Sequence, residues 1–274
     1  MLTPGQIAHF ETFGFLVLRQ LFTPEEAAIM KRESIEIFDE VRGSKPFTGE
    51  KWEQVQPFFE RRPFSAMLVD DDRVYNIGVD LLGPDFFLIG TEGSLHVGDT
   101  PWHGGPPPEN AVRHVKIAFY LDPLTRDTGA VRVVPGSHMC GDAFADRLED
   151  EIRDGAETWS VAPDQVPAVV VETVPGDVVV FWHNTKHAAF GGSKRRRMFT
   201  MNFYEYVPDD RLVDFQNALA NEGRFWIDRI HGEAMLRTAG PERMVHLRQV
   251  IDNDFKVAEV HARLRQERSE PSRG

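Results

Sequence analysis

The stretch VRHVKIAFYL (112–121) begins a run of short apolar segments that decides the fold. Turn-forming pairs such as Asp-Pro, Thr-Gly and Pro-Gly separate these segments, which is typical of consecutive β-strands. The other segments are AVRVVPGSH (130–138), PAVVVETV (167–174), PGDVVVFW (175–182) and RRMFTMNFYEY (196–206). Short strands at this spacing predict a jelly roll, whose sheets enclose an interior mouth suited to a ligand or a metal.

Helices are expected on both sides of this mainly β centre. Residues 3–14 place apolar side chains at helical spacing, and Thr23-Pro-Glu-Glu is a typical start for a second helix. The helical pattern returns after Asp209. Further strands are expected at GFLVLRQLF (14–22) and FFLIG (86–90). Because no repeat or low-complexity linker divides the chain, we predict one domain over residues 1–274.

The composition favours a protein that acts on a small molecule. The chain has 274 residues, of which 41% are hydrophobic and 27% are charged, and its net charge is −12. This acidity argues against binding to a nucleic acid polymer, because phosphate backbones are held by surplus Lys and Arg. We find no apolar run long enough to span a bilayer. A single cysteine, Cys140, and a start without a secretory signal indicate a cytoplasmic location.

The segment DTPWHGG (99–105) carries the feature that bears most on the chemistry. A non-haem Fe(II) oxygenase normally binds its metal through two histidines and one carboxylate on one octahedral face. His103 is the candidate first ligand, but Gly105 stands where a His-x-Asp/Glu pair would have its carboxylate. Glycine supplies no ligand. The open coordination position can therefore take an anion such as chloride, which would change the reaction from hydroxylation to halogenation.

The second histidine is expected in HNTKHAAFGG (183–192), which offers His183 and His187. We favour His187, because it precedes small residues that would let a cosubstrate approach closely. A lone histidine is more often an ordinary loop residue, so these assignments depend on their flanking motifs. His96 with Asp99 is a poorer pair, since residues three apart on an extended segment face opposite ways. We interpret Asp99 as a turn residue.

Four stretches resemble the phytanoyl-CoA dioxygenase family of Fe(II)/2-oxoglutarate enzymes. They are LTPGQIAHFETFGFLVLRQLFTPEEA (2–27), VGDTPWH (97–103), YLDPLTRDTGAVRVVPGSH (120–138) and PGDVVVFWHNTKHAAFGGSKRRRMFTMNF (175–203). The resemblance implies a cupin-like double-stranded β-helix, with iron held by His103 and His187 and with O2 as the oxidant. It also implies that an arginine binds a carboxylate of 2-oxoglutarate. Arg196 is our choice, with Arg197 as its rival because one residue reverses the face of a strand.

Gly105 departs from the family, whose hydroxylases have Asp at this place. Since the other expected elements are preserved, the resemblance favours a halogenase over an oxygenase that has lost its metal. With glycine at this place, the sequence is similar to the nucleotide halogenases that chlorinate C2′ of deoxyadenosine monophosphate in the biosynthesis of nucleoside antibiotics. A hydroxylase with water in the open position and a non-catalytic cupin-like binding protein are the alternatives.

A purine nucleotide would need aromatic surfaces and cations near the metal. Trp102, Tyr120 and Phe190 are the candidates for stacking, and each could instead belong to the core. Lys116, Arg195 and Arg197 are the candidates for the phosphate, and each could instead be a surface charge. Residues 104–108 (GGPPP) are expected to form a wall beside the metal. The sequence makes no prediction of the oligomeric state.

Overall fold

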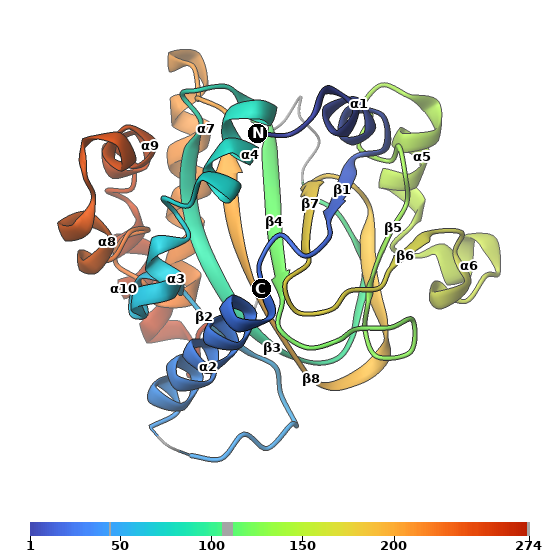
Figure 1. Cartoon of the computed structure of the whole chain (residues 1–274), viewed down its shortest axis with the longest axis horizontal. Coiled ribbons are helices and arrows are strands. Elements are labelled where there is room, and N and C mark those ends of the chain that lie inside the picture. Colours follow the sequence, from blue (N-terminus) through green and yellow to red (C-terminus); the bar gives the residue numbers. More distant parts are fainter. Residues whose placement is uncertain (44, 106–111, 273–274) are drawn as a thin grey trace.

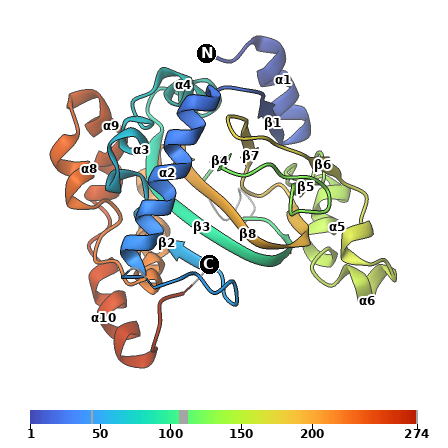
Figure 2. The same ribbon diagram turned by 60° about the horizontal axis from the view of Figure 1, so that its bottom comes forward.

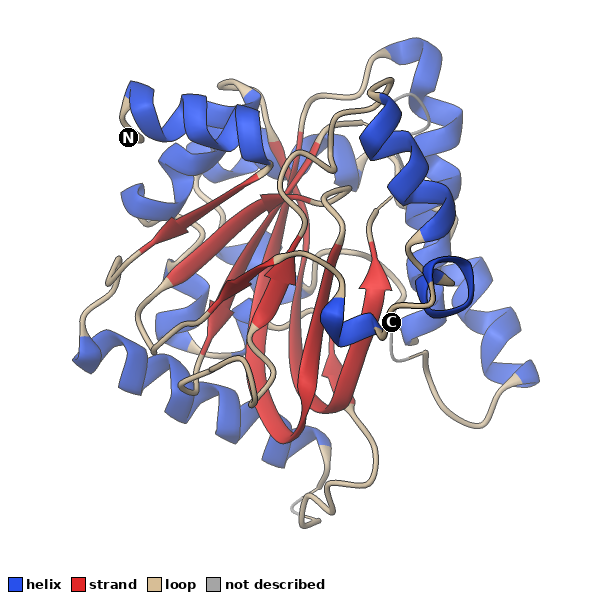
Figure 3. Ribbon diagram, turned by 90° about the vertical axis from the view of Figure 1, so that its right-hand side faces the viewer, coloured by secondary structure: helices blue, strands red, loops and turns tan. Residues whose placement is uncertain are grey.

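The computed structural model describes residues 1–43, 45–105 and 112–272. Its strands form one antiparallel sheet that is nearly closed into a barrel, and helices surround it (Figure 3). This confirms the predicted double-stranded β-helix with flanking helices. The strands are β1 (Phe15–Leu18), β2 (Glu53–Val55), β3 (Phe87–His103), β4 (His114–Tyr120), β5 (Val131–Val133), β6 (Val169–Val171), β7 (Val178–Trp182) and β8 (His187–Tyr204).

The helices that the sequence predicts near its two ends flank the sheet. Further helices lie between residues 63 and 159. Figure 1 shows α7 to α10 gathered on one side of the sheet and α5 and α6 on the other, and Figure 2 shows α2 running across it. The α-helices are α1 (Pro4–Phe13), α2 (Pro24–Val41), α3 (Pro63–Met67), α4 (Asp72–Leu82), α5 (Ala143–Glu151), α6 (Gly155–Trp159), α7 (Leu212–Asn221), α8 (Glu233–Thr238), α9 (Pro241–Ile251) and α10 (Val257–Glu267). The 3-10 helices are η1 (Phe59–Arg61), η2 (Pro163–Gln165), η3 (Asp209–Arg211) and η4 (Glu222–Phe225). No helix in the described part of the chain is both long and apolar enough to cross a membrane.

Local sequence explains where the first two helices begin. Thr3 and Thr23 are N-cap residues, and each accepts a hydrogen bond from the backbone N–H three residues later. The residues at those positions, Gln6 and Glu26, return a side-chain bond to the cap backbone, which completes a capping box in each helix. A proline follows each cap, where its fixed φ suits the first helical turn.

Strand β8 joins the two halves of the barrel. The sheet order is β1-β7-β4-β8-β3-β2, and β5 pairs with β6 and with β8. The first residues of β8 pair with β5, its last residues pair with β4, and β3 runs beside it from one end to the other. The segment 97–103 is therefore part of a long strand, and our interpretation of Asp99 as a turn residue is wrong. Its carboxylate accepts a hydrogen bond of 2.7 Å from the backbone N–H of Gly192 in β8.

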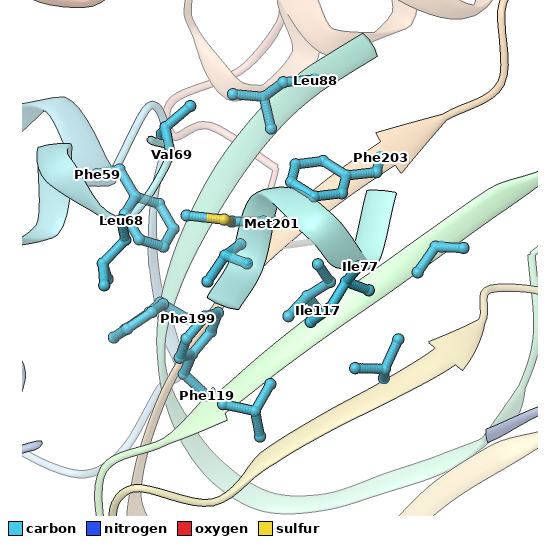
Figure 4. Packing of buried hydrophobic residues seen from close by; sticks show 14 of the residues in the cluster. Phe59, Leu68, Val69, Ile77, Leu88, Ile117, Phe119, Phe199, Met201 and Phe203 are labelled. Carbon is cyan, nitrogen blue, oxygen red and sulfur yellow. The ribbon is translucent and has the colours of Figure 1, made fainter. Parts of the chain in front are cut away.

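Alternation along β4 and β8 separates the helix-facing core from the interior of the barrel. Phe119 of β4 and Phe199, Met201 and Phe203 of β8 are fully buried in the main hydrophobic cluster (Figure 4), to which α2 and α4 also contribute residues. Their neighbours in sequence point the other way, because successive side chains of a strand face opposite sides. Every second residue of these strands is thus available to build a site inside the barrel.

Candidate active site

The interior faces of β3, β4 and β8 surround a cavity of about 350 Å³. Residues of η4 and the following segment close its other side. The strand residues that line it are polar at many places where the outer face of the same strand is apolar, so the cavity is built by the alternation described above. They include His114, Lys116 and Tyr120 of β4 and Arg196, Met198, Thr200, Asn202 and Tyr204 of β8.

His103 and His187 lie side by side at one end of this cavity. His103 ends β3, His187 begins β8, and the two residues pair in register. Their ring centroids are 4.1 Å apart. The Nδ1 atoms lie 2.8 Å from the carbonyl oxygen of Pro101 and 2.7 Å from that of Thr185, respectively. Since a carbonyl only accepts, each Nδ1 carries the proton and each Nε2 keeps its lone pair for a metal.

Burial also holds both imidazoles in the neutral form that binds metals. It lowers the pKa of His103 and brings the pKa of His187 well below the ordinary range of histidine. The two residues therefore fit the metal-binding role that the sequence assigned to them. Within the described residues, no three His, Cys, Asp or Glu side chains are arranged to hold one ion. The donor set consists of two imidazoles.

Gly105 lies against the histidine that we did not choose as a ligand. Its backbone N–H donates a 2.8 Å hydrogen bond to the carbonyl oxygen of His183. A Cβ added at Gly105 would lie 2.3 Å from Nδ1 of His183, a separation that real Cβ atoms essentially never show. The glycine thus allows a close approach of the His183 ring. Residues 106–108 of the predicted loop lie outside the described part of the chain.

Arg196 faces the cavity, and Arg197 faces away from it. The Arg196 side chain is buried and donates to the carbonyl of Gly129 at 2.7 Å and to Oγ1 of Thr100 at 2.9 Å. Its Nε has no hydrogen-bond partner among the described residues. Arg197 donates to both carboxylate oxygens of Asp122, at 2.7 and 2.8 Å. Of the two, only Arg196 is placed to meet a carboxylate inside the barrel.

The structure brings two of the six substrate candidates of the sequence to the cavity. Lys116 and Tyr120 line it, and burial raises the pKa of Tyr120 to about 12. Trp102 and Phe190 are buried in a separate hydrophobic cluster, so they are core residues and not stacking surfaces. Arg195 is exposed and lines a different hollow, beside α2. These three candidates, like Arg197, are not part of the cavity lining.

A chain of polar contacts crosses the cavity wall from β4 to β3. Nε2 of His114 lies 3.0 Å from Oδ1 of Asn202, and the amide nitrogen of Asn202 donates to Glu92 at 3.1 Å. Glu92 in turn lies 3.8 Å from the ammonium group of Lys116. His114, Asn202 and Glu92 were not predicted as site residues from the sequence. The alternation of polar and apolar residues in β4 and β8 was the available signal for the first two.

Glu222 adds a carboxyl group from the C-terminal helices. It lines the cavity beside Glu92, and its nearest cation is Arg224, at 3.6 Å. The pKa of Glu222 is raised to about 7, mainly by burial and also by the charge of Glu92, whereas Arg224 and Lys116 oppose the shift. No sequence signal pointed to Glu222, because it reaches the barrel only through the packing of helices distant in the chain.

The raised pKa of Glu222 predicts a pH-dependent contribution to stability. The folded protein keeps a proton that the unfolded chain releases above the ordinary range of glutamate, so this contribution is full at acid pH and is lost as the pH rises through about 7. Glu222→Gln removes the titration. We expect the free energy of unfolding of the variant, relative to the parent, to rise by about 2–3 kcal/mol between about pH 5 and about pH 8.

Urea denaturation at several pH values measures this difference. Glu259→Gln, at an exposed position of α10, is the matched control for the change of charge. A difference between Glu222→Gln and the parent that stays constant over this pH range would contradict the assignment.

Comparisons with known proteins agree with this geometry. Residues 85–198, which contain His103, His187 and Arg196, match the model of a family described as phytanoyl-CoA dioxygenase. The matched stretch covers less than half of the chain. No curated protein matches the sequence of the chain.

Solved structures of similar fold come from several enzymes. HygX from Streptomyces hygroscopicus, with nickel and 2-oxoglutarate bound, aligns with a TM-score of 0.60 at 18% identity over 76% of this chain and 88% of its own. EctD from S. alaskensis with bound Fe gives 0.58 at 18%, over 74% and 77%. SnoN, the non-heme alpha ketoglutarate dependent epimerase from nogalamycin biosynthesis, gives 0.56 at 18%, over 74% and 85%. At such identities the likeness shows the fold.

Proposed function

We propose that this protein is a Fe(II)/2-oxoglutarate-dependent halogenase that chlorinates an unactivated C–H bond of a small molecule. The observation that carries the proposal is the pair of register-matched histidines with glycine two residues after the first of them. Because no third His, Cys, Asp or Glu of the described chain joins them, a coordination position is left for an exogenous anion. The family match and the metal-bound neighbours support the iron and the 2-oxoglutarate.

We assign a different role to each group of residues in the cavity. His103 and His187 would hold the iron through Nε2, and Arg196 would hold a carboxylate of 2-oxoglutarate through its guanidinium group. The small side chains of Ala188 and Ala189 line the wall between these anchors, where they leave room for the cosubstrate. When bound, iron with 2-oxoglutarate and O2 supplies the oxidising power to remove the hydrogen atom, while the cosubstrate leaves as succinate and CO2. The protein orients the target C–H bond and excludes competing water.

For the substrate, we propose a purine deoxynucleotide, deoxyadenosine monophosphate, chlorinated at C2′ in the biosynthesis of a nucleoside antibiotic. A cavity of about 350 Å³ lies in the range of small-molecule sites. Lys116 and Arg224 supply cations for a phosphate, and Tyr204 and Phe225 supply aromatic surfaces within the lining. Glu222 can accept a hydrogen bond from an exocyclic amino group, a donor that adenine has.

An anaerobic titration separates this proposal from its alternatives. We expect Fe(II) and 2-oxoglutarate to give a weak visible charge-transfer band, and we expect chloride to shift it. A non-catalytic binding protein would give no band, and a hydroxylase with water in the open position would give a band that ignores chloride. Mass spectrometry of an aerobic reaction with deoxyadenosine monophosphate, followed by other nucleotides, then tests the product for the isotope pattern of chlorine.

A further inference from the structure

The ring of His183 fills the volume that a side chain at position 105 would need. A Cβ built on Gly105 would lie 2.3 Å from Nδ1 and 2.8 Å from Cγ of that ring. The backbone bond from Gly105 to His183 fixes the approach, at 2.8 Å. His183 follows the last residue of β7, and its backbone N–H is bonded to the carbonyl of His114. The backbone of His183 is therefore held by two hydrogen bonds, one from Gly105 and one to His114.

The ring of His183 differs from those of His103, His114 and His187 in its hydrogen bonding among the described residues. The rings of His103, His187 and His114 each have a polar contact of 3.0 Å or less. Within the described residues, no such contact is found for the ring nitrogens of His183, although it lines the cavity. Its ring rests on that of His114, with centroids 4.2 Å apart. A ring N–H that lines the cavity without a protein acceptor is available to a ligand there.

The geometry argues against His183 as a third metal ligand. Its ring centroid is 6.4 Å from that of His187, whereas the rings of His103 and His187 are 4.1 Å apart. A neutral imidazole has a single ring N–H to donate.

We propose that His183 donates its ring N–H to the halide in the coordination position that Gly105 leaves open. This inference rests on the proposed function, because it assigns a protein partner to the exogenous anion of that site. A monatomic anion accepts such a bond from any direction, and a hydrogen bond to a charged acceptor is stronger than one between neutral groups. His183 is then a positioning residue: it sets where the halide sits and how tightly it is held.

The experiment compares two variants of His183 in the full-length protein. His183→Phe keeps a planar ring but removes the donor, and His183→Asn keeps an N–H at a place similar to that of Nδ1. Each protein is loaded with Fe(II) and 2-oxoglutarate without oxygen and titrated with chloride while the visible band is followed. We expect the chloride dissociation constant to rise about tenfold or more for His183→Phe and by less than about threefold for His183→Asn.

Iron affinity, measured by competition with a chelator, is the second readout. We expect it to stay within about threefold of the parent in both His183 variants, and to be lost in His187→Ala. If the parent band ignores chloride, the proposed halogenase fails, independently of His183. If the parent responds and His183→Phe binds chloride equally well, the inference about His183 is overturned. It is also overturned if either variant loses iron as His187→Ala does. His183→Leu gives the same comparison if His183→Phe does not fold.

Discussion

Replacing Gly105 with aspartate in a chain that also carries His183→Ala should create a three-ligand iron site that no longer responds to chloride. The aspartate would stand two residues after His103, the spacing of a His-x-Asp pair, and would occupy the anion position with a like charge. We expect the charge-transfer band to become insensitive to chloride and any product formed from deoxyadenosine monophosphate to be hydroxylated. Iron affinity should rise, since a third protein ligand is added.

Gly105→Asp alone should do less, because the side chain at 105 meets the His183 ring. With Nδ1 only 2.3 Å from the new Cβ, the ring or the backbone must move, at a cost of about 1–3 kcal/mol of stability. His183→Ala alone is the other control, and it should retain a chloride response, although a weaker one. Chlorination by the double variant would refute the anion site at Gly105.

Arg196→Met should weaken the binding of 2-oxoglutarate by at least about a hundredfold, because it removes a buried charged partner of the carboxylate. The neighbouring substitution Arg197→Met is a close control. Arg197 is bound to Asp122 on the opposite face of β8, so we expect cosubstrate affinity within about threefold of the parent. The measurement is a titration of the Fe(II) protein with 2-oxoglutarate, with thermal unfolding as a check of folding.

Arg196→Lys keeps this test decisive if the methionine variant is unstable. Lysine retains the charge but lacks the planar fork, so an intermediate loss of affinity is expected. An equal loss in Arg196→Met and Arg197→Met would remove Arg196 from the site.

The sequence predicted the barrel because local signals and the tertiary fold agree there. Its strands are short, apolar and separated by turn residues, and its terminal helices carry capping boxes. The alternation of polar and apolar residues along β8 would have identified Arg196, and not Arg197, as the inward-facing arginine. Thr200 and Asn202 share the face of Arg196, while Phe199 lies on the other face. It would also have excluded Trp102, which precedes His103 on the same strand and therefore faces the opposite way.

Other parts of the site could not be foreseen from local pattern. Glu222 and Arg224 reach the cavity from η4, a segment far from the strands in sequence, through helix packing that no spacing encodes. The contact between His183 and Gly105 depends on how closely the bend after β7 approaches the end of β3. The sequence contains no signal that the ring of His183 will occupy the space next to Gly105.

Strand β8 carries both anchors of the proposed chemistry, His187 at its start and Arg196 further along. Its pairing with β3 has several irregularities between these two residues, around the glycines at 191 and 192. Inserting one residue there would rotate the guanidinium out of the barrel, unless a new bulge absorbed the extra residue, whereas inserting two would preserve the inward orientation. Over evolutionary time, this part of β8 should therefore change length in even steps wherever no new bulge forms.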